Sequence, residues 1–132
     1  MKSRILAIDD DAIVRRLLVR LLTNQGYEVR TAADGETGLT ALEEEASPAA
    51  IICDLCLPGI SGIDVVRRIK EAERWKRIPV LMLTGEGADE TRGAALESGA
   101  DLFLTKPFSS YEILDAIQQL LSGGSAGESL AA

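Results

Sequence analysis

The sequence contains no histidine, which excludes an imidazole-ligated zinc site. Aromatic residues make up only 4% of the chain while 46% of it is hydrophobic, so we expect a core of Leu, Ile, Val and Ala, as in packed helices and sheets. Cysteine is also scarce. The two cysteines, Cys53 and Cys56, form a C-x-x-C pattern, which in an α/β protein is compatible with a redox pair.

Long hydrophobic runs are missing as well. The apolar segment 5–8 follows Met1-Lys2-Ser3-Arg4 and is too short for the core of a signal peptide, and no segment approaches membrane-spanning length. We therefore expect a cytoplasmic protein without a membrane partner.

Basic residues are outnumbered, with 14 Lys and Arg against 21 Asp and Glu, which gives a net charge of −7. Affinity for nucleic acid rests on clustered basic side chains, so this composition argues against direct binding to DNA or RNA. The adjacent arginines Arg15-Arg16 and Arg67-Arg68 are interpreted as solvated outer faces of helices.

A chain of 132 residues suits one domain, and its pattern is that of alternating strands and helices. Residues 1–121 are expected to form the domain and the Gly-Ser-rich residues 122–132 a flexible tail. Such an ending suggests a stand-alone module, although a piece of a longer chain would have the same sequence. The strands are predicted at Arg4–Ile8, Glu28–Ala32, 49–53, 80–83 and 102–104, and the helices at about 11–24, 35–46, from 62 into the basic segment 74–77, 88–98 and Ser110–Leu121.

Some expectations concern the packing of single helices. Trp75, beside the third helix, is predicted to be a partly exposed lid on the core. Gly93 lies in the middle of the fourth helix and costs about 1 kcal/mol relative to Ala, so this helix should be weak and easily rearranged. The first helix is predicted to bury one apolar stripe made of Val14, Leu17, Leu18, Leu21 and Leu22.

Alternating short strands and helices favour parallel strand pairing through right-handed crossovers. The economical topology is a doubly wound, flavodoxin-like α/β fold with a five-stranded parallel sheet in the order 2-1-3-4-5. In this order the first and third strands are neighbours, which brings Asp9 and Asp10 beside Asp54 at the edge where such sheets bind ligands.

Three carboxylates crowded at this edge repel one another, by about 4 kcal/mol for each pair at 4 Å and an effective dielectric constant near 20. A hard divalent cation would offset this repulsion, and a few carboxylates that leave room for water and phosphate suit Mg²⁺ better than Ca²⁺.

Two further groups end neighbouring strands. Thr84 offers a hydroxyl with the open residue Gly85 beside it, and Lys106 offers an ammonium directly before Pro107, at a peptide bond that can be cis. A cation, an ammonium and a hydroxyl around Asp54 indicate phosphoryl transfer, with Asp54 as the nucleophile that forms an aspartyl phosphate.

Jointly these elements are specific, and the sequence resembles the receiver domain of the two-component response-regulator family over about residues 4–121. The resemblance is carried by four motifs, Ile8-Asp9-Asp10-Asp11, Asp54-Leu55-Cys56-Leu57-Pro58-Gly59-Ile60-Ser61-Gly62, Leu83-Thr84-Gly85 and Lys106-Pro107-Phe108.

The resemblance implies a phosphoacceptor. Asp54 would take a phosphoryl group from a phosphohistidine of a histidine kinase or phosphotransfer protein. Asp10, Asp54 and the backbone carbonyl of Cys56 would ligate Mg²⁺, and Asp9 would assist through a water molecule. Such a module is not an enzyme beyond its own phosphorylation and dephosphorylation.

The resemblance also implies a switch. Thr84 and Lys106 would hold the phosphoryl oxygens, and movements of Thr84 and of Phe103 would remodel the face made by the fourth helix, fifth strand and fifth helix. That face would contact an effector protein, which the sequence does not name. Phe103 lacks the hydroxyl of a tyrosine, and a role in core packing stays open for it.

Cys56 departs from the residues usual in the family two positions after the acceptor. Because the metal would use its backbone carbonyl, we expect ligation to survive and the hydrolysis rate of the phosphoryl group to change. With Glu86, Cys56 would border the path of the attacking water.

Two other functions fit parts of the pattern. A Mg²⁺-dependent phosphohydrolase would use the same aspartyl phosphate but needs an acid for the leaving group, for which only Asp9 and Glu86 are candidates. A redox-modulated scaffold would use Cys53 and Cys56, yet Cys53 is expected to pack into the sheet as a small hydrophobe. A monomer is the default expectation, with a dimer possible.

Overall fold

Five parallel strands form one sheet in the order β2-β1-β3-β4-β5, in a computed structural model that describes residues 2–85, 93 and 97–123. The predicted α/β fold with a doubly wound, flavodoxin-like sheet is confirmed. The predicted fourth helix falls largely on residues outside the described part, as does most of the predicted tail. The strands are β1 (Arg4–Ile8), β2 (Glu28–Ala32), β3 (Ala50–Asp54), β4 (Val80–Thr84) and β5 (Leu102–Thr105), and the helices are α1 (Ala12–Asn24), α2 (Gly35–Glu44), α3 (Gly62–Glu71) and α5 (Ser110–Leu121).

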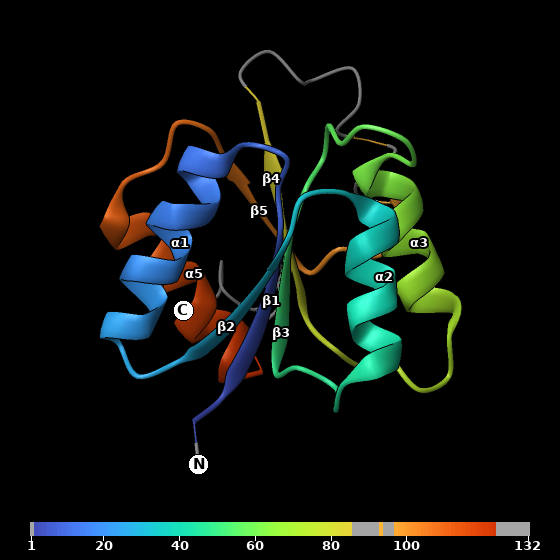
Figure 1. Ribbon diagram of the computed structural model, residues 1–132, viewed down its shortest axis with the longest axis horizontal. Coiled ribbons are helices and arrows are strands. Elements are labelled where there is room, and N and C mark those ends of the chain that lie inside the picture. Colours follow the sequence, from blue (N-terminus) through green and yellow to red (C-terminus); the bar gives the residue numbers. More distant parts are fainter. Residues whose placement is uncertain (1, 86–92, 94–96, 124–132) are drawn as a thin grey trace.

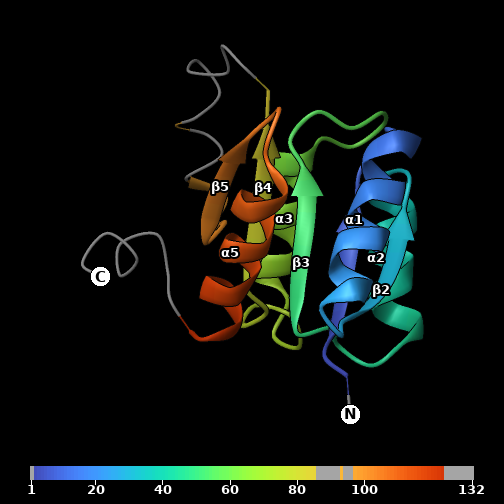
Figure 2. The ribbon, with the colours of Figure 1, turned by 90° about the vertical axis from the view of Figure 1, so that its left-hand side faces the viewer.

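The helices cover both faces of the sheet. In Figures 1 and 2, α1 and α5 lie on one face and α2 and α3 on the other. Because successive side chains of a strand point to opposite faces, each strand supplies both halves of the core. Ile51 and Cys53 of β3 pack under α2 and α3, while Ile52 packs under α1 and α5. All five residues of β3 are buried, so a reactive group of this strand can meet solvent only at its end.

Three strands extend one residue beyond their predicted ends, so that Asp54, Thr84 and Thr105 are the last residues of β3, β4 and β5. Asp54 pairs in register with Leu83, and Thr84 with Thr105. The sheet ladder therefore sets the backbone spacing of these residues at the carboxyl edge.

Helix α2 ends at Glu44, two residues earlier than predicted. Glu45 already has extended backbone, and its carboxylate lies 3.2 Å from the Arg4 guanidinium and 2.8 Å from that of Arg30. These ion pairs hold the segment against β1 and β2 before Pro48 could end the helix.

Helix α1 begins after Asp11, whose carboxylate accepts hydrogen bonds from the amides of Ile13 and Val14. Its buried stripe is narrower than predicted. Leu18 and Leu22 are fully buried, whereas Leu17 is 38% exposed, because it sits at the edge of the face that contacts the sheet.

This difference predicts unequal effects of truncation within one helix. Leu22→Ala should lower the free energy of unfolding by about 2–5 kcal/mol, since it opens a cavity in the core. Leu17→Ala, the matched control, should cost no more than about 1 kcal/mol because its side chain is already partly in water. Urea unfolding of both variants checks this, and equal losses would contradict the packing described for α1.

Trp75 is buried, with 7% exposure, so the prediction of a partly exposed lid was wrong. The ring packs on the core cluster under α2 and α3, and the Arg74 guanidinium lies 4.5 Å from the ring centroid. Arg74 also reaches Glu43 of α2 at 3.6 Å. The Arg74 side chain covers the outer side of the ring. The charged residues around Trp75 in the sequence therefore wrongly suggested that the ring is exposed.

No helix within the described part of the chain is both long enough and apolar enough to cross a membrane.

Candidate functional site

The structure brings Asp9, Asp10 and Asp54 together at the carboxyl edge of the sheet. Ile8 pairs with Cys53 across β1 and β3, so the residues that follow them are neighbours. One carboxylate oxygen from each of the three aspartates lies within 4.8 Å of the others. Asp9 is fully buried and Asp54 only 6% exposed, whereas Asp10 is exposed. The cluster therefore opens to solvent on the side of Asp10.

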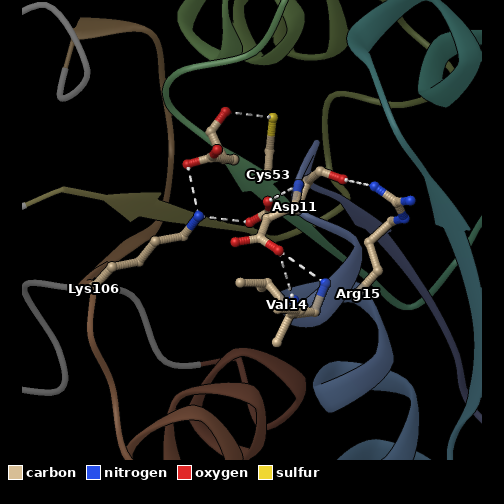
Figure 3. Close-up of polar contacts among 8 residues, drawn as sticks. Asp11, Val14, Arg15, Cys53 and Lys106 are labelled. Atoms are coloured by element: carbon tan, nitrogen blue, oxygen red, sulfur yellow. Dashed lines mark hydrogen bonds and ion pairs between the residues drawn. The ribbon is translucent and has the colours of Figure 1, made fainter.

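Lys106 reaches the same cluster from the loop after β5, opposite the side from which Arg15 approaches (Figure 3). Its Nζ lies 2.8 Å from Oδ2 of Asp9 and 3.5 Å from Oδ1 of Asp54. Its backbone amide donates to the carbonyl of Thr84 at 2.7 Å, and the Lys106–Pro107 peptide bond is cis. The ammonium thus bridges the two buried carboxylates.

The proton affinities of these groups reflect burial and charge. Burial and then the negative charge of Asp9 raise the pKa of Asp54 to about 6, against the opposing effect of Lys106. Burial alone would lower the pKa of Lys106, but its close contact with the Asp9 carboxylate and the charges of Asp54 and Asp9 raise it overall. Near neutral pH, therefore, Asp54 is mostly ionised and Lys106 is charged.

The residues at this edge fit a hard divalent cation. Three carboxylates face one ammonium, which leaves an excess of negative charge. Oδ2 of Asp9 is buried and, within the described residues, has no aligned hydrogen-bond partner, although the Lys106 ammonium lies beside it as an ion pair. Carboxylate oxygens with unused lone pairs are the ligands that Mg²⁺ prefers. The acidic pocket can therefore hold a metal ion.

Thr84 and Phe103 lie on adjacent strands but in different surroundings. Thr84 is partly buried at the end of β4, and no atom of the described residues lies within 4 Å of where a Cβ on the adjacent Gly85 would be. Phe103 pairs with Met82 in register and packs, partly buried, against the core cluster under α2 and α3. Phe103 therefore has the core-packing role that the sequence left open.

The two cysteines are in opposite environments. Cys53 is fully buried in β3, where desolvation by burial, the first cause, and the charges of Asp54 and Asp9 raise the pKa of its thiol. Cys56 is exposed in the loop after β3, and both thiols are free. A buried thiol with a raised pKa is a poor nucleophile, so this C-x-x-C lacks the reactive pair that redox chemistry needs.

Gly62 allows α3 to start close to the carboxyl end of β3. Its amide donates to the Leu55 carbonyl at 2.9 Å. A Cβ atom at this position would overlap the Asp54 carbonyl oxygen and lie 2.8 Å from the Leu55 Cα. A glycine is therefore required here for close approach.

Arg15 is the site residue that the sequence interpretation missed. It is partly buried, and its Nη1 donates to the backbone carbonyl of Asp9 at 2.8 Å, so it is not a solvated side chain. Arg16 is exposed, as are Arg67 and Arg68, in agreement with the prediction for those residues. The side chains of a helix lean toward its N-terminus, which for α1 is the end next to Asp9. This direction could have indicated from the sequence that Arg15 reaches the site.

Comparison with known proteins gives the family. The model of the response regulator receiver domain matches residues 5–118. Over 121 residues, covering 92% of this chain, the transcriptional regulatory protein TcrA of Mycobacterium tuberculosis is 40% identical and the phosphate regulon regulator PhoB of Escherichia coli is 36% identical. The solved structure of the chemotaxis response regulator CheY4 of Vibrio cholerae aligns with a TM-score of 0.86 at 32% identity, covering 92% of this chain and 100% of that one.

The chain belongs to the response regulator receiver domain family of two-component signalling. It spans about half the length of the curated relatives, 47% of TcrA and 52% of PhoB. Receiver domains are signalling modules, so neither the phosphohydrolase nor the redox scaffold is favoured.

Proposed function

We propose that this chain accepts a phosphoryl group on Asp54 from a phosphohistidine, in the presence of Mg²⁺, and passes the signal on by protein contact. The observation that carries the proposal is the bridge made by the Lys106 ammonium between Asp9 and Asp54 at the open edge of the sheet. The Asp54 carboxylate is mostly ionised near pH 7. It also lies close to the Lys106 ammonium, whose positive charge would stabilise a bound phosphoryl group.

In the proposed reaction a carboxylate oxygen of Asp54 forms a bond to phosphorus as the bond between phosphorus and the histidine nitrogen breaks. The leaving imidazole takes up a proton and stays on the donor protein. Lys106 and the hydroxyl of Thr84 would hold the phosphoryl oxygens and compensate their charge. Loss of the phosphoryl group to water would return the domain to its starting state.

Asp10, Asp54 and the Cys56 carbonyl would hold Mg²⁺, with Asp9 assisting through water. When bound, the ion would neutralise negative charge shared between the carboxylates and the phosphoryl oxygens. It would also relieve the repulsion that Lys106 only partly compensates in the metal-free protein.

The signal would leave through the face around β5 and α5. In this proposal Thr84 moves toward the phosphoryl group and Phe103 turns inward, which changes the surface offered to an effector. Phe103 packs against the cluster that contains Met82, so its rotation would be coupled to the core.

The proposed partners are a histidine kinase or phosphotransfer protein as donor and an effector of unknown identity. TcrA and PhoB are transcriptional regulatory proteins, which makes control of transcription one route for the effector. A cytoplasmic location is part of the proposal. That these residues themselves bind no nucleic acid, and that they act as a monomer, stay predictions.

Reaction with acetyl phosphate and Mg²⁺ tests the function, with the phosphorylated fraction followed by intact mass and free phosphate by a coupled assay. We expect at most one phosphoryl group per chain, none after chelation of Mg²⁺, and slow phosphate release that follows decay of the modified species. Rapid turnover of simple phosphate esters, many equivalents per chain, would instead indicate a phosphohydrolase.

Cys56 is expected to influence the lifetime of the phosphoryl group. Cys56→Ala should still be phosphorylated, because a backbone carbonyl remains for the metal. Its phosphoryl group should decay severalfold faster, since the smaller side chain leaves more room for the attacking water at this exposed loop. Decay of purified phosphorylated protein, followed by intact mass, measures this. Unchanged decay would contradict the role given to Cys56.

A further inference from the structure

We propose that Arg15 is a positioning residue for the metal-binding turn: its guanidinium holds the Asp9 carbonyl and thereby sets the direction of the Asp10 carboxylate. This inference rests on the proposed function, because it concerns the Mg²⁺ that phosphoryl transfer would use. Arg15 lies on α1 and would take no direct part in the chemistry; its role would be to orient a metal ligand.

Three polar groups of Asp9 hold the turn between β1 and α1: its amide, its Oδ1 and its carbonyl. The Asp9 amide donates to the Ala32 carbonyl of β2 at 3.0 Å, and Oδ1 of Asp9 accepts from the Asp11 amide at 2.9 Å. The remaining backbone group, the Asp9 carbonyl, accepts from Nη1 of Arg15 at 2.8 Å, a contact drawn in Figure 3. Arg15 is thus the only side chain in the described residues that secures this carbonyl.

Asp10 depends on that contact. Its side chain is exposed and makes no hydrogen bond or ion pair within the described part of the chain. The carbonyl of Asp9 and the amide of Asp10 belong to one planar peptide group, so fixing the oxygen fixes the plane from which the Asp10 side chain departs. Without Arg15 this plane could rotate, and the Asp10 oxygen would leave the position near Asp9 and Asp54.

Arg16 provides a matched comparison. Arg15 and Arg16 line the same surface pocket beside Val19 and Thr31. Arg16 carries the same charge on the same helix but is exposed and makes no hydrogen bond or ion pair in the described ranges. Both arginines therefore place a positive charge near the acidic site. Only Arg15 also contacts the Asp9 carbonyl.

Charge and positioning predict opposite changes in metal affinity. A nearby positive charge repels Mg²⁺, so loss of an arginine that acts only through its charge should tighten binding slightly. Loss of a residue that orients a ligand should weaken it, and removal of such outer-shell contacts typically costs about 10- to 100-fold in metal affinity. The sign of the change separates the two roles.

The test is calorimetric titration of Mg²⁺ into the 132-residue wild type, Arg15→Met and Arg16→Met. We expect the Kd for Mg²⁺ to rise about tenfold in Arg15→Met, and to stay equal or fall slightly in Arg16→Met. A Kd for Arg15→Met equal to or below that of the wild type would overturn the inference.

Circular dichroism and urea unfolding establish that each variant is folded before titration. Should Arg15→Met fail to fold, Arg15→Lys takes its place, because it keeps the charge but lacks the planar guanidinium that reaches the carbonyl. A raised Kd in the folded Arg15→Lys variant supports the inference, and a wild-type Kd overturns it. If the wild type itself binds no Mg²⁺, the metal part of the proposed function fails instead, so the two failures are distinguishable.

Discussion

Asp54→Asn is expected to stabilise the protein against unfolding when no divalent cation is present. The carboxylate of Asp54 is 6% exposed and lies beside the buried charge of Asp9, so its ionised form is unfavourable in the folded state. Asparagine has nearly the same shape and no charge. A pKa raised from the ordinary 3.8 to about 6 corresponds to at most about 3 kcal/mol, so we expect a gain of about 1–3 kcal/mol at pH 7.5.

The pH dependence gives the expected sign. Because the pKa of Asp54 is higher in the folded than in the unfolded protein, the folded state holds the proton more tightly between about pH 4 and pH 6. The wild type should therefore lose stability from this group as the pH rises through that range and no more above it. Asp54→Asn lacks this loss, so its advantage should grow from pH 4 to pH 6 and then level off.

Urea unfolding at several pH values in the presence of a chelator measures the effect. Asp64→Asn is the control, because Asp64 is half exposed on α3 and pairs with Arg67 only at 3.6 Å, so little change is expected. Addition of Mg²⁺ should stabilise the wild type by mass action and Asp54→Asn much less. A metal-free Asp54→Asn variant that is less stable than the wild type would contradict this account of the site.

Lys106→Met is expected to have the opposite effect. Its ammonium lies 2.8 Å from an oxygen of the fully buried Asp9, and no other cation in the described residues makes an ion pair with that carboxylate. Removing one partner of a buried pair leaves an uncompensated charge and typically costs about 3–5 kcal/mol. Since Lys106 itself is partly exposed, we expect the free energy of unfolding to fall by about 2 kcal/mol or more at pH 7.5.

The loss of stability in Lys106→Met should depend on pH and on metal. As the pH falls through the pKa of Asp54, about 6, that carboxylate takes up a proton, so the part of the difference from the wild type that Asp54 causes should shrink. Mg²⁺ should bind the variant more tightly than the wild type, because it no longer competes with the ammonium. Lys76→Met is the matched control, since Lys76 pairs with Glu73 on the surface, where such pairs contribute about 0–1 kcal/mol. Urea unfolding with and without Mg²⁺ decides, and equal losses in both variants would count against the bridge.

Much of the site could be predicted from the sequence, because the strand order determines which strand ends lie side by side. Once the strand order is 2-1-3-4-5, Asp9 and Asp54 must be neighbours, since β1 pairs with β3. The same reasoning placed Thr84 and Lys106 at this edge. Every residue of β3 is buried, so Asp54 can reach solvent only because it is the last residue of the strand.

What the sequence could not supply were contacts that depend on side-chain direction. Trp75 lies among charged residues, and only the packing of α2 and α3 shows that its ring faces the core. Leu17 belongs to the apolar pattern of α1 but falls outside the area that the sheet covers. Arg15 and Arg16 are the same residue type side by side, and the position of the Asp9 carbonyl decides which of them is bound.

The intact mass of the protein after incubation with acetyl phosphate and Mg²⁺ tests the phosphoacceptor proposal most directly, for the wild type, Asp54→Asn and the control Asp64→Asn. The account predicts one added phosphoryl group on the wild type and on Asp64→Asn, and none on Asp54→Asn. Phosphorylation of Asp54→Asn to the wild-type extent would contradict it, because the acceptor would then be another residue.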